Sequence, residues 1–291
     1  MKTGLVLEGG GMRGLFSAGV MDVMMEHGIR FDGIVGVSAG ASFGCNYKSH
    51  QIGRVLRYNV RFKDDPRYMG LRSLFRTGDL VAAEFSYHTL PKELDVFDFE
   101  AYNNDPTEFH VVCTDVLTGN PVYHRLDVMN DVGLEWIRAS ASMPLVSKPV
   151  SLDGRLLLDG GISDSIPLRY FQEQGFERNI VILTQPKGFF KKTKLMPLFH
   201  LFMRKYPAIV QAMARRHLMY NEELAYLEEQ EQLGNILLIN PQDIVPIGRT
   251  EQDETKMRRV YAMGRAKAEE MLGEIKDFAK HATASCPTRH V

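Results

Sequence analysis

Short apolar runs alternate along the chain with longer segments in which apolar residues recur at helical spacing. The runs are four to six residues long and bounded by glycine, proline or polar residues, which predicts buried strands. The predicted strands cover residues 2–7, 33–37, 109–114, 121–125, 155–158, 179–184 and 236–239. Because strands and helices alternate, the pattern predicts an α/β fold with a mainly parallel sheet covered by helices on both faces.

Helical spacing is clear after the first strand, where Phe16, Val20, Val23 and Met24 share one face and Gly28 ends the pattern. Residues 51–104 have weak periodicity, and we expect them to form helices and loops that cover one side. Asp153-Gly154 predicts a hairpin turn ahead of the strand 155–158. The remaining predicted helices cover residues 39–48, 131–141, 167–175 and 251–281, and the tail from residue 282 is expected to be loose.

The size and composition of the chain limit the classes of protein it can belong to. With 291 residues, 44% of them hydrophobic, it can bury the core of one sizeable α/β domain, and two domains are the alternative. Its three cysteines are scattered and form no C-x-x-C pair, which argues against a disulfide framework or a zinc site and favours a reducing, cytoplasmic setting. No apolar run is long enough for a signal-peptide core or a membrane span. No H-E-x-x-H or EF-hand spacing indicates a metal.

Charge is unevenly distributed along the chain. The formal net charge of −1 argues against nucleic acid as a partner. Residues 187–221 nevertheless hold eight lysines and arginines and no acidic residue, so this segment carries +8 and the rest of the chain −9. Large apolar side chains lie between these cations. The segment therefore predicts either peripheral contact with an anionic membrane or an amphipathic helix packed on the core with a solvated basic face.

A glycine-rich turn follows the first predicted strand. Gly9, Gly10, Gly11 and Gly14 stand between that strand and the first helix, where free backbone N–H groups can receive an anion. The spacing also fits a dinucleotide-binding turn, but Asp32 precedes its strand and so lies at the wrong end for a ribose. A Walker phosphate loop is excluded because Gly14 is followed by leucine and phenylalanine.

Ser38 lies where the second predicted strand meets its helix. Gly36-x-Ser38-x-Gly40 fits a nucleophile elbow, a strained turn whose flanking positions must lack bulk. The alternative is that Ser38 only caps the helix that follows.

Asp159 ends the apolar strand at 155–158 and precedes Gly160 and Gly161. It is either a carboxylate at a strand tip, with room for a ligand, or an ordinary turn residue. Because the glycine turn, Ser38 and Asp159 each follow a predicted strand, one arrangement places all three at the same edge of the sheet.

Together these groups could perform acyl transfer. A serine needs a proton acceptor to attack, and the oxyanion that forms needs backbone donors. In a Ser-Asp-His order the base would be the histidine at position 200, 217, 281 or 290, and none of these follows a predicted strand, so a serine–aspartate dyad is the simpler arrangement. The pKa of a free aspartate, about 3.9, must then be raised by burial.

In sequence order, the motifs Gly9-Gly10-Gly11-Met12-Arg13-Gly14, Gly36-Val37-Ser38-Ala39-Gly40, Ala139-Ser140-Ala141-Ser142-Met143-Pro144 and Asp159-Gly160-Gly161 resemble those of the patatin-like phospholipases. The resemblance spans residues 9–161 and weakens after about Pro167. It implies a three-layer α/β/α fold with a helical C-terminal extension. It also implies hydrolysis of lipid acyl esters without a metal or cofactor, with Ser38 as nucleophile and Asp159 as base. The amides of Gly10, Gly11 and Met12, with Arg13 beside them, would stabilise the oxyanion.

On this basis, residues 1–185 are expected to form a catalytic core. Residues 186–291 would add the basic segment, a last core strand and C-terminal helices packed on the same domain. The leading hypothesis is a lipid acyl hydrolase in the cytoplasm or at the inner membrane surface. The alternatives are a soluble carboxylesterase or thioesterase, and a non-catalytic module that binds an anion or a lipid.

Overall fold

The structure, a computed structural model, describes residues 1–193 and 197–280. Its centre is an eight-stranded sheet. Five strands run parallel in the order β3 (Glu108–Asp115), β2 (Gly33–Val37), β1 (Thr3–Leu7), β7 (Arg178–Ile182) and β8 (Ile236–Ile239). The antiparallel strands β4 (Pro121–Arg125) and β6 (Arg155–Asp159) both pair with β3, and β5 (Val150–Leu152) pairs with β6.

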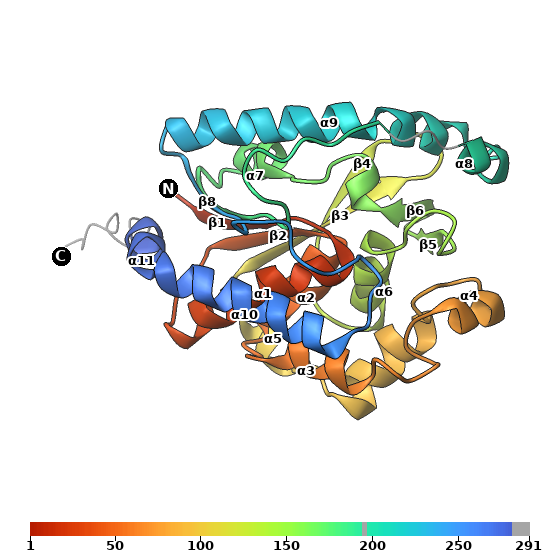
Figure 1. The fold of residues 1–291 in the computed structure, drawn as a ribbon, viewed down its shortest axis with the longest axis horizontal. Helices are drawn as coiled ribbons and strands as arrows, with labels where there is room; N and C mark the ends of the chain where they lie inside the picture. The colour runs from red at the N-terminus through yellow and green to blue at the C-terminus, as the bar shows by residue number, and fades with distance from the viewer. Residues whose placement is uncertain (194–196, 281–291) are drawn as a thin grey trace, which may run out of the picture.

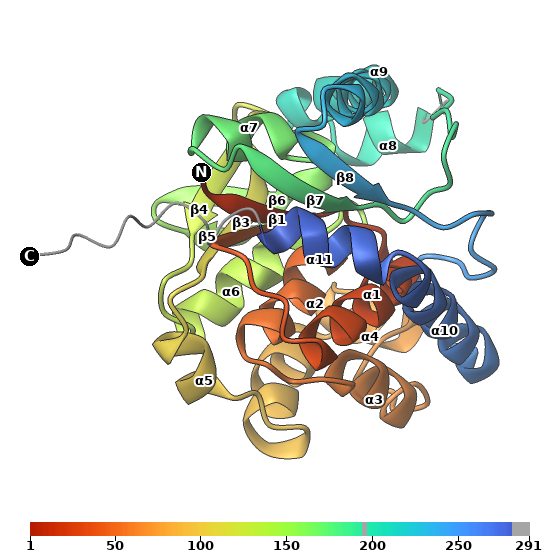
Figure 2. The ribbon, with the colours of Figure 1, turned by 90° about the vertical axis from the view of Figure 1, so that its left-hand side faces the viewer.

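Helices cover both faces of the sheet, as Figures 1 and 2 show. One face carries α7 (Leu168–Glu173), α8 (Pro197–Phe202) and α9 (Pro207–Gln232). The opposite layer contains α1 (Leu15–Glu26), α2 (Ala39–Lys48), α3 (Arg54–Arg61), α5 (Phe99–Asn104), α6 (Asp131–Ser140), α10 (Glu254–Glu270) and α11 (Leu272–Lys280). The chain from α3 to α5 also contains α4 (Leu71–Thr77) and a π-helix at Phe85–Leu94.

The alternation of side chains along each strand explains the two layers. In β1, Leu5 and Leu7 join the core beneath α1 and α2, whereas Val6 joins the core beneath α7 and α9. Successive side chains of a strand point to opposite faces, so an entirely apolar strand must be covered on both sides. The expected three-layer α/β/α fold is therefore confirmed.

The C-terminal helices pack against the first helix of the chain. A Cβ on Gly19 of α1 would lie 2.2 Å from the carbonyl oxygen of Tyr261, and one on Gly264 of α10 would lie 2.0 Å from that of Phe16. Glycine at both positions therefore lets the two helices approach closely. These contacts, with the pairing of β8 and β7, join the C-terminal residues to the same sheet, while the boundary at residue 185 stays a prediction.

One prediction of local structure was wrong. The helix expected over residues 251–281 is two helices, because α10 ends at Glu270 and α11 starts at Leu272. Strand β6 runs antiparallel to β3, so Asp159 comes to the end of the sheet that carries Ser38 from the opposite strand direction. The residues 194–196 and the tail from 281 onwards, which include Cys286 and two histidines, lie outside the described residues. Among the described helices, none combines the length and apolar character needed to cross a bilayer.

Candidate active site

A cavity of about 460 Å³ lies at the carboxyl ends of β1 and β2. The glycine turn at residues 9–13, Ser38 and Asp159 all line it, so the structure brings the predicted site residues together. Much of the remaining wall is apolar and comes from residues 58–97 and 129–146. A volume of this size can hold a small organic ligand.

Ser38 adopts the strained backbone expected of a nucleophile elbow. Its φ of 56° and ψ of −121° lie in a region that non-glycine residues rarely occupy. The crowding around it requires glycine: a Cβ on Gly9 would lie 2.9 Å from that of Ser38, and one on Gly40 would lie 2.3 Å from the carbonyl oxygen of Leu7. A Cβ on Gly36 would meet the backbone of Gly40 at 2.6 Å. The Ser38 side chain makes no capping hydrogen bond, so the helix-cap alternative does not apply.

The motif at residues 139–144 holds both candidate residues in place. The Ser38 N–H donates to Ser140 Oγ at 2.9 Å, and that hydroxyl donates to the carbonyl of Val112 on β3 at 2.6 Å. The N–H of Asp159 donates to the carbonyl of Ser142 at 2.8 Å. The sequence resemblance included this motif without a function for it, and the structure assigns it the positioning of Ser38 and Asp159.

Replacing Ser140 by alanine is therefore expected to misplace Ser38 without removing it. The partly buried N–H of Ser38 would lose its acceptor, which costs about 1–3 kcal/mol of stability. We expect kcat on an ester substrate to fall about 10-fold or more while KM changes little, because positioning errors act on the transition state. Steady-state kinetics and thermal unfolding of Ser140→Ala test this, with Ser86→Ala as a control at a serine that contacts neither residue. An unchanged kcat would contradict it.

Asp159 reaches Ser38 through the register of β6. Strand β2 pairs with residues 108–112 of β3, and β6 pairs with residues 113–115. Because β4 occupies the other edge of β3, β2 and β6 share one edge and meet end to end. Gly160 makes this junction tight, since a Cβ there would lie 2.2 Å from the carbonyl oxygen of Val112. The carboxyl ends of the two strands therefore meet although the strands run in opposite directions.

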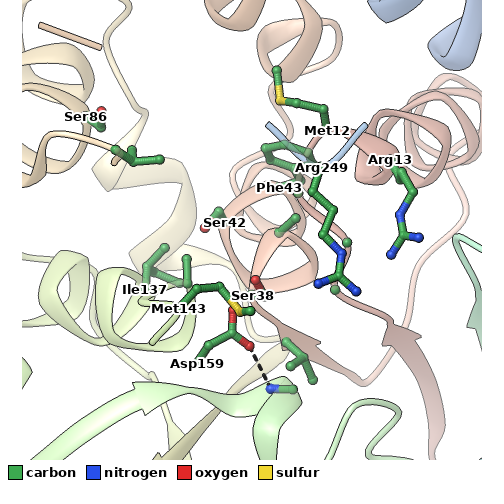
Figure 3. Close-up of a pocket in the computed structure, with 18 of the residues that line it drawn as sticks. Met12, Arg13, Ser38, Ser42, Phe43, Ser86, Ile137, Met143, Asp159 and Arg249 are labelled. Carbon is green, nitrogen blue, oxygen red and sulfur yellow. Dashed lines mark hydrogen bonds between the residues drawn. The ribbon is translucent and has the colours of Figure 1, made fainter. Parts of the chain in front are cut away.

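The surroundings of Asp159 favour a basic carboxylate. The side chain is fully buried, which raises its pKa; interactions with Ser38, Arg216 and the Gly161 N–H oppose this rise. Oδ1 accepts the Gly161 N–H at 2.8 Å (Figure 3). Ser38 is close enough to lower the pKa of the carboxyl. Even so, Oδ2 of Asp159 has no hydrogen bond of regular geometry among the described residues. A raised pKa and an available oxygen suit a proton acceptor.

The glycine turn presents amides to the cavity. Gly10 and Gly11 line it, and in the described part of the chain neither N–H donates to a carbonyl or a side chain. The Met12 N–H, in contrast, donates to the carbonyl of Arg249 at 3.0 Å, so this predicted donor is already engaged. A Cβ on Gly14 would meet the Phe43 ring at 3.0 Å, which explains the glycine at this position.

Glu8 ties the glycine turn to the neighbouring strand and to α9. Its carboxylate accepts the N–H and the hydroxyl of Thr184 at 2.6 and 2.9 Å, and the hydroxyl of Tyr220 at 2.7 Å. The Thr184 hydroxyl also lies 3.1 Å from the carbonyl of Gly9. The turn is thereby held in one conformation, as a preorganised anion site requires.

Four cations that the sequence did not mark as site residues also line the cavity: Arg54, Lys191, Arg216 and Arg249. Arg216 donates to the carbonyl of Gly161 and so supports the residue that contacts Asp159. Arg249 stands in the connection between β8 and α10, in no local pattern that would have marked it. Residues far apart in sequence meet here only through the fold.

The geometry also bears on two alternatives. Asp32 accepts the N–H of Thr3 at 2.7 Å, at the start of β1, so it lies at the opposite end of the sheet from the glycine turn. This excludes the dinucleotide arrangement. In the part of the chain that the structure describes, no histidine lines the cavity, and no three metal-ligating side chains form a cluster.

Comparison with known protein families identifies the chain. The model of the patatin-like phospholipase family matches residues 5–171, more than half of its length. The chain belongs to the patatin-like phospholipase family. Residues 206–280 of this patatin-like protein match a second model, a domain of unknown function (DUF6363). The two models together cover most of the sheet and the helices that complete the cavity.

Curated relatives of the patatin-like chain agree with this assignment. It is 34% identical over 193 residues to the uncharacterized protein YjjU of Escherichia coli, covering 64% of this chain and 52% of that protein. It is 31% identical over 183 residues to the lysophospholipase NTE1 of Cryptococcus neoformans, covering 62% of this chain and 11% of that protein. The chain thus spans about half of the first relative and a small part of the second.

Among solved structures, VipD of Legionella pneumophila is similar, with a TM-score of 0.47 and 14% identity over 94% of this chain and 67% of that one. At the level of the family, membership supports hydrolysis of lipid acyl esters.

Proposed function

We propose that this chain is a serine acyl hydrolase that cleaves carboxylic esters of phospholipids or other acyl lipids. The observation that carries the proposal is the strained Ser38, which faces a fully buried carboxylate, Asp159, inside one cavity (Figure 3). The apolar wall suits an acyl chain, and the name of the NTE1 relative, a lysophospholipase, is consistent with such a substrate.

The reaction proceeds in two halves. Ser38 Oγ attacks the ester carbonyl carbon while its proton passes to Asp159, and the oxyanion that forms accepts hydrogen bonds from the amides of Gly10 and Gly11, beside Arg13. The intermediate collapses, and the leaving alcohol takes the proton from Asp159, which leaves an acyl-serine. Water then attacks the acyl-serine, gives its proton to Asp159, and releases the fatty acid as Ser38 regains its proton.

The pH dependence of this reaction follows from the charge on Asp159. The carboxyl must be ionised to accept a proton, and burial raises its pKa. As the pH is lowered, activity should therefore begin to fall at a higher pH than it would with an aspartate of ordinary pKa. Arg216 lowers this pKa. We therefore expect Arg216→Gln to move the acid limb of kcat/KM to higher pH, whereas Arg215→Gln, an exposed neighbour on α9, leaves it in place. An acid limb that stays unmoved in Arg216→Gln would count against Asp159 as the base.

Labelling with a fluorophosphonate tests the proposal directly. An activated serine reacts with this reagent, and an ordinary hydroxyl does not. Peptide mapping should find the label on the peptide that contains Ser38. A protein that takes up no label, or takes it up on another serine, would favour the non-catalytic binding module.

We further propose that the basic segment brings the cavity to an anionic membrane. Phe190, Leu201 and Phe202 are 67%, 58% and 65% exposed, and Lys192 and Arg204 are exposed near them. Phe75 on α4 is 87% exposed, and α4 and α8 lie toward the same end of the molecule (Figure 1). Apolar side chains among cations bind anionic lipid surfaces.

Sedimentation with vesicles tests this contact. The purified chain should bind vesicles that contain anionic phospholipid and not vesicles of neutral phospholipid alone. Phe190→Ser together with Phe202→Ser should weaken binding, while Leu233→Ser, an equally exposed leucine after α9, should not. If the protein binds neither kind of vesicle, the soluble esterase is the better description.

A further inference from the structure

Arg13, Lys191 and Arg249 line one end of the cavity. None of the three forms an ion pair among the described residues, although nineteen ion pairs are present there. Arg13 Nε is buried and has no hydrogen-bond partner in residues 1–193 and 197–280. Three cations of this kind at one end of a cavity leave donors available for an anion.

Arg249 is held by its backbone. Its carbonyl oxygen accepts the Met12 N–H at 3.0 Å. A Cβ on Gly11 would lie only 2.3 Å from the same oxygen, so this close approach requires glycine. This contact docks the connection between β8 and α10 on the glycine turn. The guanidinium points towards Ser38 and Arg13 (Figure 3).

Lys191 is held by α9. Its N–H donates to Asn221 Oδ1 at 2.9 Å, and Asn221 Nδ2 donates back to its carbonyl at 3.0 Å. The ammonium lies 3.4 Å from the centre of the Tyr220 ring. Burial, together with the nearby charges of Arg216 and Arg249, lowers the pKa of Lys191 to about 6, against the opposite effect of Glu8 and Glu223. This end of the cavity is therefore short of negative charge. An anion bound beside Lys191 would raise this pKa again and favour the ammonium form.

The two ends of the cavity differ in character. Figure 3 places Arg249 and Arg13 on one side of Ser38, and Ile137 and Met143 on the other. An extended molecule with its reacting carbonyl at Ser38 would therefore place one part among cations and the other among apolar side chains. An acyl chain fits the apolar end, because burial there removes it from water.

We propose that Arg249 and Lys191, together with Arg13, form an anion subsite that binds the phosphate of a phosphorylated acyl lipid during hydrolysis. Phosphate oxygens accept charge-assisted hydrogen bonds from guanidinium and ammonium groups. This inference rests on the proposed ester hydrolysis. It also assigns a function to the C-terminal region: Arg249 lies in the segment that matches the domain of unknown function, so that segment completes the substrate site.

A pair of substrates that differ only in the phosphate tests the subsite. A 1-acyl lysophosphatidic acid, which is the simplest lysophospholipid, and the 1-acylglycerol with the same chain are compared on wild type, Arg249→Gln and Lys191→Gln. We expect each variant to lower kcat/KM for the lysophospholipid by about 10- to 100-fold, the loss of one charged hydrogen bond. The acylglycerol rate should change less than about two-fold, the size of an indirect effect.

The control for this experiment is Arg259→Gln, which removes an exposed arginine of α10 that does not line the cavity. It should leave both rates unchanged. Equal losses on the two esters in Arg249→Gln, or no loss on either, would overturn the subsite while leaving the hydrolase intact.

A binding measurement separates the subsite from catalysis. Inorganic phosphate should raise the melting temperature of Ser38→Ala protein, and Arg249→Gln added to that protein should abolish the rise. If phosphate binds but wild type prefers neither ester, the site takes free phosphate and the lipid assignment is overturned. If neither ester is cleaved, the proposed hydrolase function fails. The anion site is then judged by melting temperature alone: it exists if phosphate raises this temperature and Arg249→Gln abolishes the rise. The anion subsite is rejected if phosphate does not raise the melting temperature and wild type shows no preference between the two esters.

Discussion

Ser38→Ala is expected to reduce ester hydrolysis by about 10⁴-fold or more, because a serine nucleophile has no substitute in acyl transfer. Labelling by a fluorophosphonate should disappear with it. The cavity and the glycine turn remain, so binding of a lipid to the variant should persist. Initial rates on a chromogenic ester and on a lysophospholipid measure the loss.

The matched control is Ser42→Ala, one helical turn further along the same wall. Ser42 also lines the cavity, but it lies within α2 and its backbone is unstrained. The variant should keep its label and most of its activity. Full activity in Ser38→Ala, or transfer of the label to another serine, would refute the proposed nucleophile.

Ser38→Gly adds a test of the strain itself. Both variants lack the hydroxyl, but only glycine adopts a φ of 56° without strain. A strained backbone costs about 1–3 kcal/mol, and glycine loses about 0.5–1 kcal/mol through its unfolded state. We therefore expect Ser38→Gly to unfold at a higher temperature than Ser38→Ala.

Asp159→Asn is expected to have the second largest effect on activity, about 10³-fold or more, because an amide cannot accept the proton of Ser38. The shape of the side chain is kept, and Oδ1 can still accept the Gly161 N–H. The fluorophosphonate should therefore react far more slowly with this variant although Ser38 is present. Normal reactivity would show that another group removes the proton.

The same variant should be more stable than wild type. Burial raises the pKa of Asp159 in the folded state, so the folded chain favours the protonated carboxyl. The neutral carboxyl contributes fully to stability when the pH is below the pKa that Asp159 has in the unfolded chain. This contribution is lost as the pH rises through the higher pKa of Asp159 in the folded chain. Asparagine stays neutral throughout. We expect a gain on the order of 1 kcal/mol at neutral pH, which shrinks in acid. A loss of stability at neutral pH would argue that the carboxylate is well compensated.

Much of the site could be predicted because its parts are local. The elbow at Ser38 needs small neighbours two positions away, and the glycine turn needs residues without side chains, so both are visible in a few letters. The strands that carry them are short apolar runs between glycines. Chemistry that depends on one turn of backbone is encoded in the residues of that turn.

Other parts could not be predicted because they depend on register. The sequence predicted that Asp159 and Ser38 share one edge of a mainly parallel sheet, but it did not show that β6 runs antiparallel to β3 and meets β2 end to end on that strand. Arg216 and Arg249 enter the cavity from α9 and from the connection after β8, in segments whose local sequence resembles an ordinary charged surface.

The sequence by itself therefore determined the α/β class, the position of most strands and the residue types at the two strand ends, since each of these depends on neighbours along the chain. Only the tertiary structure decided that a hydroxyl and a carboxylate 121 residues apart share one cavity, and which cations stand beside them. The reason is physical: the pairing of strands and the packing of distant helices are set by contacts summed over the whole core, which no short stretch of sequence contains.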